Sequence, residues 1–206
     1  MSGNNQNSPD ESRISLRRDL RDRRLSLSPE KRNSFDEAIN KHLLQLVVSR
    51  DAGSIACYRS FNGEPDITPA CKHLIRNGCE LALPVISETN DFSMEFHPWQ
   101  SDTSLVRNWY GIDEPHNSTP MSISSFDVLI MPLVGYDLHG NRIGMGAGYY
   151  DRHLESLRDA PTPLRVGIAY SLQEVDPIRE NSWDIPLHAV VNELGCFTLS
   201  DETLNK

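Results

Sequence analysis

The sequence predicts an α/β fold in which helices flank a parallel sheet within a single domain. Its 206 residues suit one domain, because domains commonly hold about 100–200 residues. Segments of strand and helix character alternate along most of the chain, as they do in proteins with parallel sheets. Residues 126–131 are apolar except for Asp127, a pattern typical of a strand buried on both faces.

Two helices are expected at the start of the chain. Residues 11–24 are highly charged, but Ile14, Leu16 and Leu20 recur at near-helical spacing and predict a first helix. Ser28 and Pro29 form an N-cap followed by proline at the first helical position, which predicts a second helix. The apolar residues of the second helix follow a helical period and should face the core: Phe35, Ala38, Ile39, Leu43, Leu46 and Val47.

The next segments follow the order strand, loop, helix, strand. Residues 55–58 form a short apolar run, and residues 59–66 are polar and contain glycine. A helix should begin at the Thr68-Pro69 pair and end near Gly78, before a strand at residues 81–85. This order favours parallel pairing, and loops at the ends of such strands often carry functional residues.

The second half of the chain continues the alternation. Residues 92–97 alternate as a strand at a sheet edge does, and a long connection rich in Ser, Thr and Pro leads to the buried strand at residues 126–131. A helix is expected over residues 150–157, and strands over residues 164–169 and 189–191.

The net charge of −9 is distributed unevenly along the chain. Residues 1–50 carry ten basic and seven acidic side chains, whereas the remaining residues carry ten and twenty-two. A net-acidic body excludes a general nucleic-acid binder, so no nucleic-acid partner is expected. The arginine-rich first helix still allows one local site for an anion.

The expected location is cytoplasmic, with no membrane partner. The chain has no run of about 18 apolar residues, and residues 1–10 have no apolar segment of the kind found in signal peptides. We expect residues 1–10 to be a disordered leader, residues 11–200 to form the single domain, and residues 201–206 to be a C-terminal tail.

The richest local motif has Gly144, Gly146 and Gly148 alternating just before the predicted fourth helix. Glycine allows positive φ and close backbone approach, so successive N–H groups can converge on a phosphate, with Arg142 as a charged fork. The alternative is a structural turn that packs strand against helix. The motif differs from G-x-G-x-x-G, since Tyr149 stands at the last glycine position, and it lacks the Lys-Ser/Thr ending of a P-loop.

Charged side chains near this motif have two interpretations each. Asp151, on the first turn of the predicted helix, can hold Mg²⁺ against phosphate oxygens or interact with the helix dipole. In the first helix, Arg13, Arg17, Arg21 and Arg24 stack along one side. They form a solvated face or, if the helix packs beside the glycine motif, a contact with nucleotide phosphate.

Two further segments place aromatic residues beside acids. In the loop after the first strand, Glu64 can orient a polar ligand and Phe61 can stack on a ring, or the loop is a solvent-exposed turn. Residues 109–115 repeat this combination, although aromatic side chains more often belong to the core. The sequence has no G-x-S-x-G motif and no histidine spacing typical of a metal site, so hydrolase chemistry has no support.

Together, the motifs resemble a known family. The segment R-x-G-x-G-x-G-Y-Y-D at residues 142–151 is accompanied by residues 131–137, the Gly140-Asn141-Arg142 turn, the Leu16-Arg17 pair and the Trp183-Asp184-Ile185-Pro186 segment. With the loops at residues 60–66 and 110–115, they make residues 13–195 similar to the 5-formyltetrahydrofolate cyclo-ligases, also called methenyltetrahydrofolate synthetases.

We expect a monomer, and the resemblance implies an enzyme with a mixed, largely parallel sheet flanked by helices on both faces. The implied reaction is the ATP- and Mg²⁺-dependent cyclisation of 5-formyltetrahydrofolate to 5,10-methenyltetrahydrofolate, with release of ADP and phosphate. In the mechanism proposed for the family, the formyl oxygen attacks the γ-phosphate and N10 then displaces phosphate from the activated carbon. This chemistry needs no protein nucleophile.

The resemblance also implies roles for individual residues. Asp151 would bind Mg²⁺, Arg142 and Tyr150 would be catalytic, and a second metal ligand near Asp184 or His188 stays open. The other arginines of the first helix are expected to stay solvated. The ATP-binding residues would be Arg13, Arg17, Arg142, Ile143, Gly144, Met145, Gly146, Ala147, Gly148, Tyr149 and Tyr150. The substrate-binding residues would be Glu64, Tyr110, Met145, Gly146, Ala147, Gly148 and Tyr149.

Two alternative functions stay open. A regulator that binds folate or nucleotide without turnover would keep the pocket and lose the reaction. A nucleic-acid-associated protein would use the arginine-rich first helix, with an affinity that falls steeply with salt.

Overall fold

The computed structural model describes residues 9–87, 92–116, 118–160 and 162–199. Parts of the expected leader and the whole expected tail, residues 1–8 and 201–206, lie outside the described residues. The helices are α1 (Pro9–Leu25), α2 (Pro29–Ser49), α3 (Thr68–Arg76) and α4 (Tyr149–Leu154). Short 3-10 turns lie at Ile123–Ser125, Glu155–Leu157 and Ser171–Gln173. The strands are β1 (Ser54–Ala56), β2 (Glu80–Ile86), β3 (Met94–Trp99), β4 (Leu105–Arg107), β5 (Asp113–Pro115), β6 (Val128–Pro132), β7 (Gly135–Tyr136), β8 (Arg142–Ile143), β9 (Leu164–Ile168), β10 (Ala189–Asn192) and β11 (Gly195–Thr198).

The main sheet of the described residues has seven strands in the order β11-β10-β9-β6-β1-β2-β3. The five central strands pair in parallel, while β11 and β3 close the two edges in antiparallel pairing. This arrangement confirms the mixed, largely parallel sheet, and β3 lies at an edge as its alternating pattern predicted. The buried run at residues 126–131 corresponds to β6 at the centre of the sheet.

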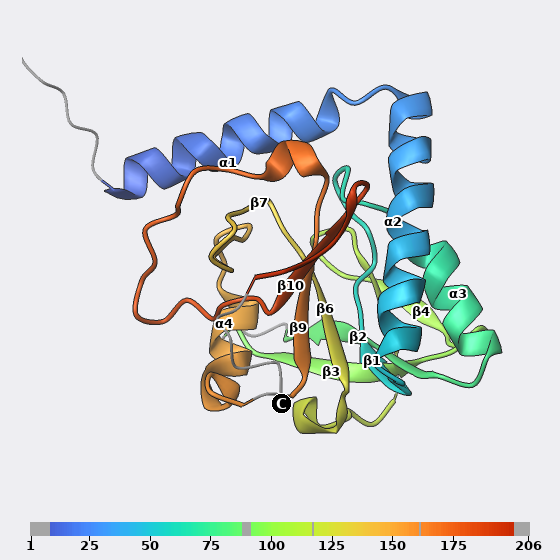
Figure 1. The fold of residues 1–206 in the computed structure, drawn as a ribbon. Helices are drawn as coiled ribbons and strands as arrows, with labels where there is room; N and C mark the ends of the chain where they lie inside the picture. Colours follow the sequence, from blue (N-terminus) through green and yellow to red (C-terminus); the bar gives the residue numbers. More distant parts are fainter. Residues whose placement is uncertain (1–8, 88–91, 117, 161, 200–206) are drawn as a thin grey trace, which may run out of the picture.

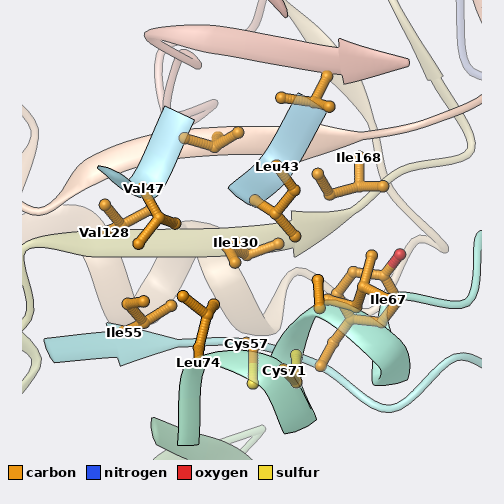
Figure 2. Packing of buried hydrophobic residues seen from close by; sticks show 14 of the residues in the cluster. Leu43, Val47, Ile55, Cys57, Ile67, Cys71, Leu74, Val128, Ile130 and Ile168 are labelled. Atoms are coloured by element: carbon orange, nitrogen blue, oxygen red, sulfur yellow. The ribbon is translucent and has the colours of Figure 1, made fainter. Parts of the chain in front are cut away.

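Alternate residues of the central strands build a separate core on each face of the sheet. Val128 and Ile130 of β6 belong to a cluster with Leu43 and Val47 of α2, and Figure 2 shows these side chains facing one another. Leu129 and Met131, which alternate with them in β6, belong to the second cluster, which includes Leu154 of α4. This period of two puts α2 and α3 on one face and α4 on the other, so helices flank both faces as predicted.

Strand connections diverge at the centre of the sheet. From β1 the chain passes through α3 to β2 on one side, whereas from β6 it passes through α4 to β9 on the other. Since β1 and β6 are parallel neighbours, with Ile55 opposite Val128, the segments that leave their carboxyl ends part from each other. Such a switch point is the usual place for a ligand site in an open α/β sheet.

Helix α1 lies across the carboxyl end of the sheet, close to β7 and the 3-10 turn at Ser171–Gln173 (Figure 1). Leu20 of α1 is fully buried in a small cluster with Val134 and Ile143. Val134 directly precedes β7, and Ile143 is the last residue of β8. This packing holds a helix from the start of the chain against the segment that leads into the glycine motif.

The three predicted N-terminal helices are confirmed, and Ser28 caps α2 by accepting a hydrogen bond from the Lys31 N–H. The fourth helix is shorter than predicted, because α4 ends at Leu154 and a 3-10 turn continues to Leu157. Among the described residues, no helix combines the length and apolar character needed to cross a membrane.

Several short strands were not predicted. The β4–β5 pair lies in the connection expected to be irregular, and β7 and β8 have two residues each. Strand β11 is mostly exposed, so its side chains carry little hydrophobic alternation. Strands that are short or largely exposed lack the periodic pattern on which such predictions depend.

A tight turn between β7 and β8 positions the glycine motif. The buried Asp137 carboxylate accepts hydrogen bonds from the N–H groups of His139, Asn141 and Ile178. At the turn, Gly140 has φ +89°, and a Cβ there would lie 2.8 Å from the carbonyl oxygen of Leu187.

We expect Gly140→Ala to lower the free energy of unfolding by about 2–4 kcal/mol, because it combines a left-handed conformation with a clash against backbone. Gly53→Ala is the matched control, since a Cβ there meets nothing within 4 Å, and it should be neutral or stabilising by up to about 1 kcal/mol. Urea unfolding of both variants measures the difference. Equal stability of the two would contradict this account of the turn.

Candidate active site

A cavity of about 680 Å³ opens at the carboxyl end of the central strands. Its walls include Tyr58 and Glu64 after β1, Pro132 at the end of β6, and the glycine motif. Cavities of roughly 300–1,000 Å³ are typical of sites for small molecules. Every residue assigned from the sequence to ATP, to the substrate or to Mg²⁺, except Ile143 and the alternative metal ligand His188, lines this cavity. Ile143 is buried against Leu20.

The first helix packs beside the glycine motif, which was the condition for a phosphate contact by its arginines. The Nε of Arg17 donates a 3.0 Å hydrogen bond to the carbonyl oxygen of Gly144, across 127 positions of sequence. Gly146 has φ +108°, and a Cβ there would lie 3.8 Å from the Cζ of Arg17. The expectation that Arg17 lies near the glycine motif is confirmed.

The glycine motif itself is open to the cavity. Residues 144–150 are partly buried or exposed, with Met145 half exposed. A turn whose only role is to pack strand against helix would be buried, so this exposure favours the ligand-binding interpretation. The six residues of α4 give a weak dipole, which means that loop N–H groups and arginines must supply most of the positive potential.

A buried ion pair joins Arg142 to Asp151 at the base of the motif. The Arg142 Nη2 and Asp151 Oδ1 atoms are 2.5 Å apart, and the side chains are 6% and 20% exposed. Asp151 Oδ1 also accepts a hydrogen bond from the Ile185 N–H. In the described part of the chain, the buried Nε of Arg142 has no hydrogen-bond partner. Such a donor is suited to an incoming anion.

Arg13 reaches the same side of the cavity from the start of α1. Its Nη2 donates to the carbonyl oxygen of Arg179 at 2.6 Å and lies 3.0 Å from Asp184 Oδ2. His188, considered as a second metal ligand, is instead buried against Arg165, with its Nε2 2.6 Å from Arg165 Nη2. Burial and this cation lower the pKa of His188 to about 4. Of the two candidate positions, only Asp184 lines the cavity.

On the other side, Glu64 is held in the loop that follows β1. Its carboxylate accepts a 3.1 Å hydrogen bond from the Phe61 N–H, and its own N–H donates back to the Phe61 carbonyl oxygen. Burial raises the pKa of Glu64 from 4.5 to about 7, although the Arg24 cation and the Phe61 N–H lower it. Near neutral pH this carboxyl group therefore exists in both protonation states.

The guanidinium of Arg24 contradicts the expectation that the remaining arginines of α1 are solvated. Arg24 is 0% exposed, whereas Arg18 and Arg23 are exposed as expected. Its Nη1 donates to Leu133 O at 3.1 Å and its Nη2 to Asn62 O at 2.8 Å. Arg24 thus ties the loop after β6 to the loop that carries Glu64, and the Leu133 carbonyl also accepts a hydrogen bond from Gln173 Nε2.

A second arginine holds the same loop. Arg32 of α2 donates to Gly63 O at 2.7 Å and to Arg24 O at 2.8 Å. Asn62 and Gly63 both have positive φ, so the turn before Glu64 is sharp and its carbonyls point toward the arginines. Neither arginine was assigned to the site from the sequence. The signal for Arg24 was its position on the same helix face as Arg13 and Arg17.

Tyr110 stands on a turn anchored to the main sheet. The Oδ1 of Asn108 accepts from the N–H groups of Tyr110 and Ile112, and its Nδ2 donates to Glu114 at 2.7 Å. Glu114 also accepts from the Ile86 N–H at the end of β2. Tyr110 is 46% exposed at the rim. Phe61 also lines the cavity, so the solvent-exposed-turn interpretation of its loop is incomplete.

Tyr150 has a hydroxyl that stays protonated. Burial raises the pKa of Tyr150 well above its ordinary value, and the nearby Glu64 raises it further while Arg142 lowers it. The phenol is therefore a hydrogen-bond donor at neutral pH and is unsuited to act as a base.

The fold and site together define an α/β protein with a cavity of small-molecule size at the switch point of its sheet. The family model of the 5-formyltetrahydrofolate cyclo-ligase family matches residues 9–193. The chain belongs to this family and is an enzyme of the cyclo-ligase type, which confirms the resemblance carried by the glycine motif.

Individual relatives agree with this assignment. A 5-formyltetrahydrofolate cyclo-ligase from Escherichia coli K12 is 34% identical over 174 residues, which cover 84% of this chain and 95% of that protein. One from Haemophilus influenzae is 31% identical over 181 residues, covering 87% and 96%. The structure of a 5,10-methenyltetrahydrofolate synthetase from Aquifex aeolicus has a TM-score of 0.79 and 31% identity, covering 92% of this chain and 93% of that one.

We expect Arg24→Met to lower the free energy of unfolding by about 1–3 kcal/mol, because Asn62 O loses its Arg24 donor and Leu133 O keeps only the donor from Gln173. Arg18→Met on the same helix is the matched control and should change stability by less than about 0.5 kcal/mol. Chemical denaturation measures both. If Arg24→Met lowers the free energy of unfolding no more than the control does, this role of Arg24 is contradicted.

Glu64 should make stability depend on pH with a definite sign. Its carboxyl group ionises near 4.5 in the unfolded chain and near 7 in the folded chain, so between these values the folded state keeps a proton that the unfolded state loses. Wild-type stability should therefore fall relative to Glu64→Gln as the pH rises through this window, by on the order of 2–3 kcal/mol. Denaturation between pH 4 and 9 tests this, and a difference independent of pH would refute it.

Proposed function

We propose that this enzyme cyclises 5-formyltetrahydrofolate to 5,10-methenyltetrahydrofolate, with ATP converted to ADP and phosphate. The observation that carries the proposal is that one cavity joins the glycine motif, braced by Arg17, to the ionisable Glu64. The first is suited to a phosphate chain and the second to a heterocycle with N–H donors and a carbonyl. Membership of the cyclo-ligase family supports the same reaction.

The nucleotide would occupy the side of the cavity formed by α1 and the glycine motif. Arg142 and Arg17 would face its phosphates, together with Arg13 and the N–H groups of residues 143–150. The unpartnered Nε of Arg142 supports this role, because a phosphate oxygen would satisfy it. Arg13 and Arg142 are already paired with carboxylates, so their cations are held in place before a ligand arrives.

The folate would lie between the glycine motif and the loops that carry Glu64 and Tyr110. A Glu64 carboxyl group with a pKa of about 7 can either accept from ring N–H groups or donate to a ring oxygen. Tyr110 and residues 145–149 would contact the rings of the same ligand. The half-exposed Tyr110 at the rim supports stacking, because a planar ligand would cover it.

The carboxylate of Asp151 suits a magnesium ion. Among the described residues no three His, Cys, Asp or Glu side chains are grouped as a metal site, but Mg²⁺ often takes only one or two carboxylates, with phosphate oxygens and water. The two hydrogen bonds described above both end on Oδ1 of Asp151, and Oδ2 would meet the ion. When bound, the ion would neutralise charge on the transferred phosphoryl group.

The protein would contribute positioning and electrostatic stabilisation to the reaction. The formyl oxygen attacks the γ-phosphorus and ADP leaves; N10 then adds to the activated carbon, loses its proton, and phosphate departs with the former formyl oxygen. Arg142 would neutralise the phosphoryl oxygens, and the protonated Tyr150 would donate a hydrogen bond beside them. The burial of Arg142 and the partial burial of Tyr150 limit the access of water to the phosphoryl group.

The test is formation of the methenyl chromophore from 5-formyltetrahydrofolate, ATP and Mg²⁺. Asp151→Asn should lower kcat/KM at least about 100-fold, because the amide loses the charge that meets the ion, while its Oδ1 can still accept from Arg142 and Ile185. Asp19→Asn, at an exposed pair with Arg23, is the matched control and should keep full activity.

Other outcomes of this assay distinguish the alternatives. No turnover by the wild-type enzyme across pH and metal conditions would overturn the proposal. Saturable ligand binding without ADP release would favour a regulator without turnover. The monomeric state and the cytoplasmic location stay predictions.

A further inference from the structure

Arg59 is a cavity arginine whose side chain contacts α3, β3 and β5. It follows β1 by three residues and lines the cavity with Glu64 and Tyr110. Its guanidinium carbon lies 5.6 Å from the centroid of the buried Trp99 ring in β3, and this cation–π contact orients the side chain. With 29% of the side chain exposed, the guanidinium remains accessible to a ligand.

Arg59 has the longest polar contacts among the arginines that line the cavity. Its Nη1 lies 3.4 Å from Thr68 Oγ1 and its Nη2 lies 4.0 Å from Asp113 Oδ2. The other four cavity arginines make contacts of 2.5 to 3.0 Å with these partners: Arg13 with Asp184, Arg17 with Gly144, Arg142 with Asp151 and Arg152 with Ala147. A weakly paired, oriented guanidinium can exchange its partner for a ligand at little cost.

We propose that Arg59 binds a carboxylate of the glutamyl portion of the folate substrate. The inference rests on the proposed function. A folate carries two carboxylates at the end remote from its pterin, and an arginine fork matches a carboxylate through two parallel N–H donors. The phosphate chain of ATP has its own arginines at the glycine motif. Arg59 is therefore the cation available to the anionic end of the second substrate.

The role is one of specificity. Since the glutamyl group is distant from the reacting formyl carbon, its contact with Arg59 would hold the folate without touching the phosphoryl transfer. Loss of this contact should weaken folate binding and leave ATP binding and kcat unchanged. Arg59→Lys should retain part of the effect, because a point charge replaces the fork.

The experiment is a two-by-two comparison of ligand and enzyme. Binding constants are measured by titration calorimetry for 5-formyltetrahydrofolate and for 5-formyltetrahydropteroate, which lacks the glutamate, and KM is measured for each where turnover occurs. Arg59→Gln should weaken binding of the glutamate-containing ligand about tenfold and leave binding of the truncated ligand unchanged. Arg107→Gln is the matched control, because Arg107 also contacts Asp113 but lies outside the cavity lining.

Each outcome has a definite meaning. Equal losses for the two ligands, or no loss for either, would overturn the role of Arg59 even if the enzyme turns over. If Arg59→Gln weakens binding of the glutamate-containing ligand alone and the wild-type enzyme shows no turnover, the Arg59 site is supported and the proposed reaction is rejected. If the wild-type enzyme binds neither ligand, both proposals fail.

Discussion

The hydrogen bonds of the buried Arg24 guanidinium set the geometry on which the site depends. Leu133 and Asn62 lie on loops that part at the switch point of the sheet, and one side chain donates to both. A loop at such a point has no neighbouring strand to satisfy its carbonyls, so a side-chain donor must do so. Because α1 supplies that donor, the helix that carries Arg13 and Arg17 is placed by the same contact. Both sides of the cavity therefore depend on the Arg24 cation, which does not itself line the cavity.

Charge in the cavity is arranged as pairs that a ligand can replace. Arg142 with Asp151 and Arg13 with Asp184 are compact pairs near the glycine motif, and Arg59 with Asp113 is a loose one. Pairing keeps buried cations compensated while the cavity is empty, and it preserves their orientation for phosphate or carboxylate oxygens. For Glu64, in contrast, burial is the main influence and raises its pKa, against a smaller lowering by the Arg24 cation. The site thus has two kinds of charged group. The paired arginines are suited to the phosphate and carboxylate groups of ligands, whereas Glu64 changes its protonation near neutral pH.

Much of the fold followed from local patterns. The apolar period of α2, its Ser28 cap and the uninterrupted run of β6 each reflect an element that buries a large face, and burial leaves a strong sequence signal. The exposed β4–β5 pair and β11 bury little and left none. The site was predicted in part: the glycine motif, Arg17, Glu64 and Asp151 were assigned from motif and family resemblance, and the structure brings them to one cavity. Arg24 was not assigned, because an arginine in a charged segment has the same local pattern whether it is solvated or buried. Arg59 was not assigned either, because it is the only charged residue between positions 52 and 63 and belongs to no charge pattern.

The sequence by itself determined the α/β class, the order of the main helices and strands, and the family, since each depends on residues close together in the chain or on a specific motif. Only the tertiary structure decided that Arg17 reaches the glycine motif through the Gly144 carbonyl, that Arg24 is the fully buried arginine of α1, and that His188 faces Arg165 instead of the cavity. These facts depend on contacts between segments as far apart as 127 positions. Long-range packing chooses among side chains that local spacing leaves equivalent.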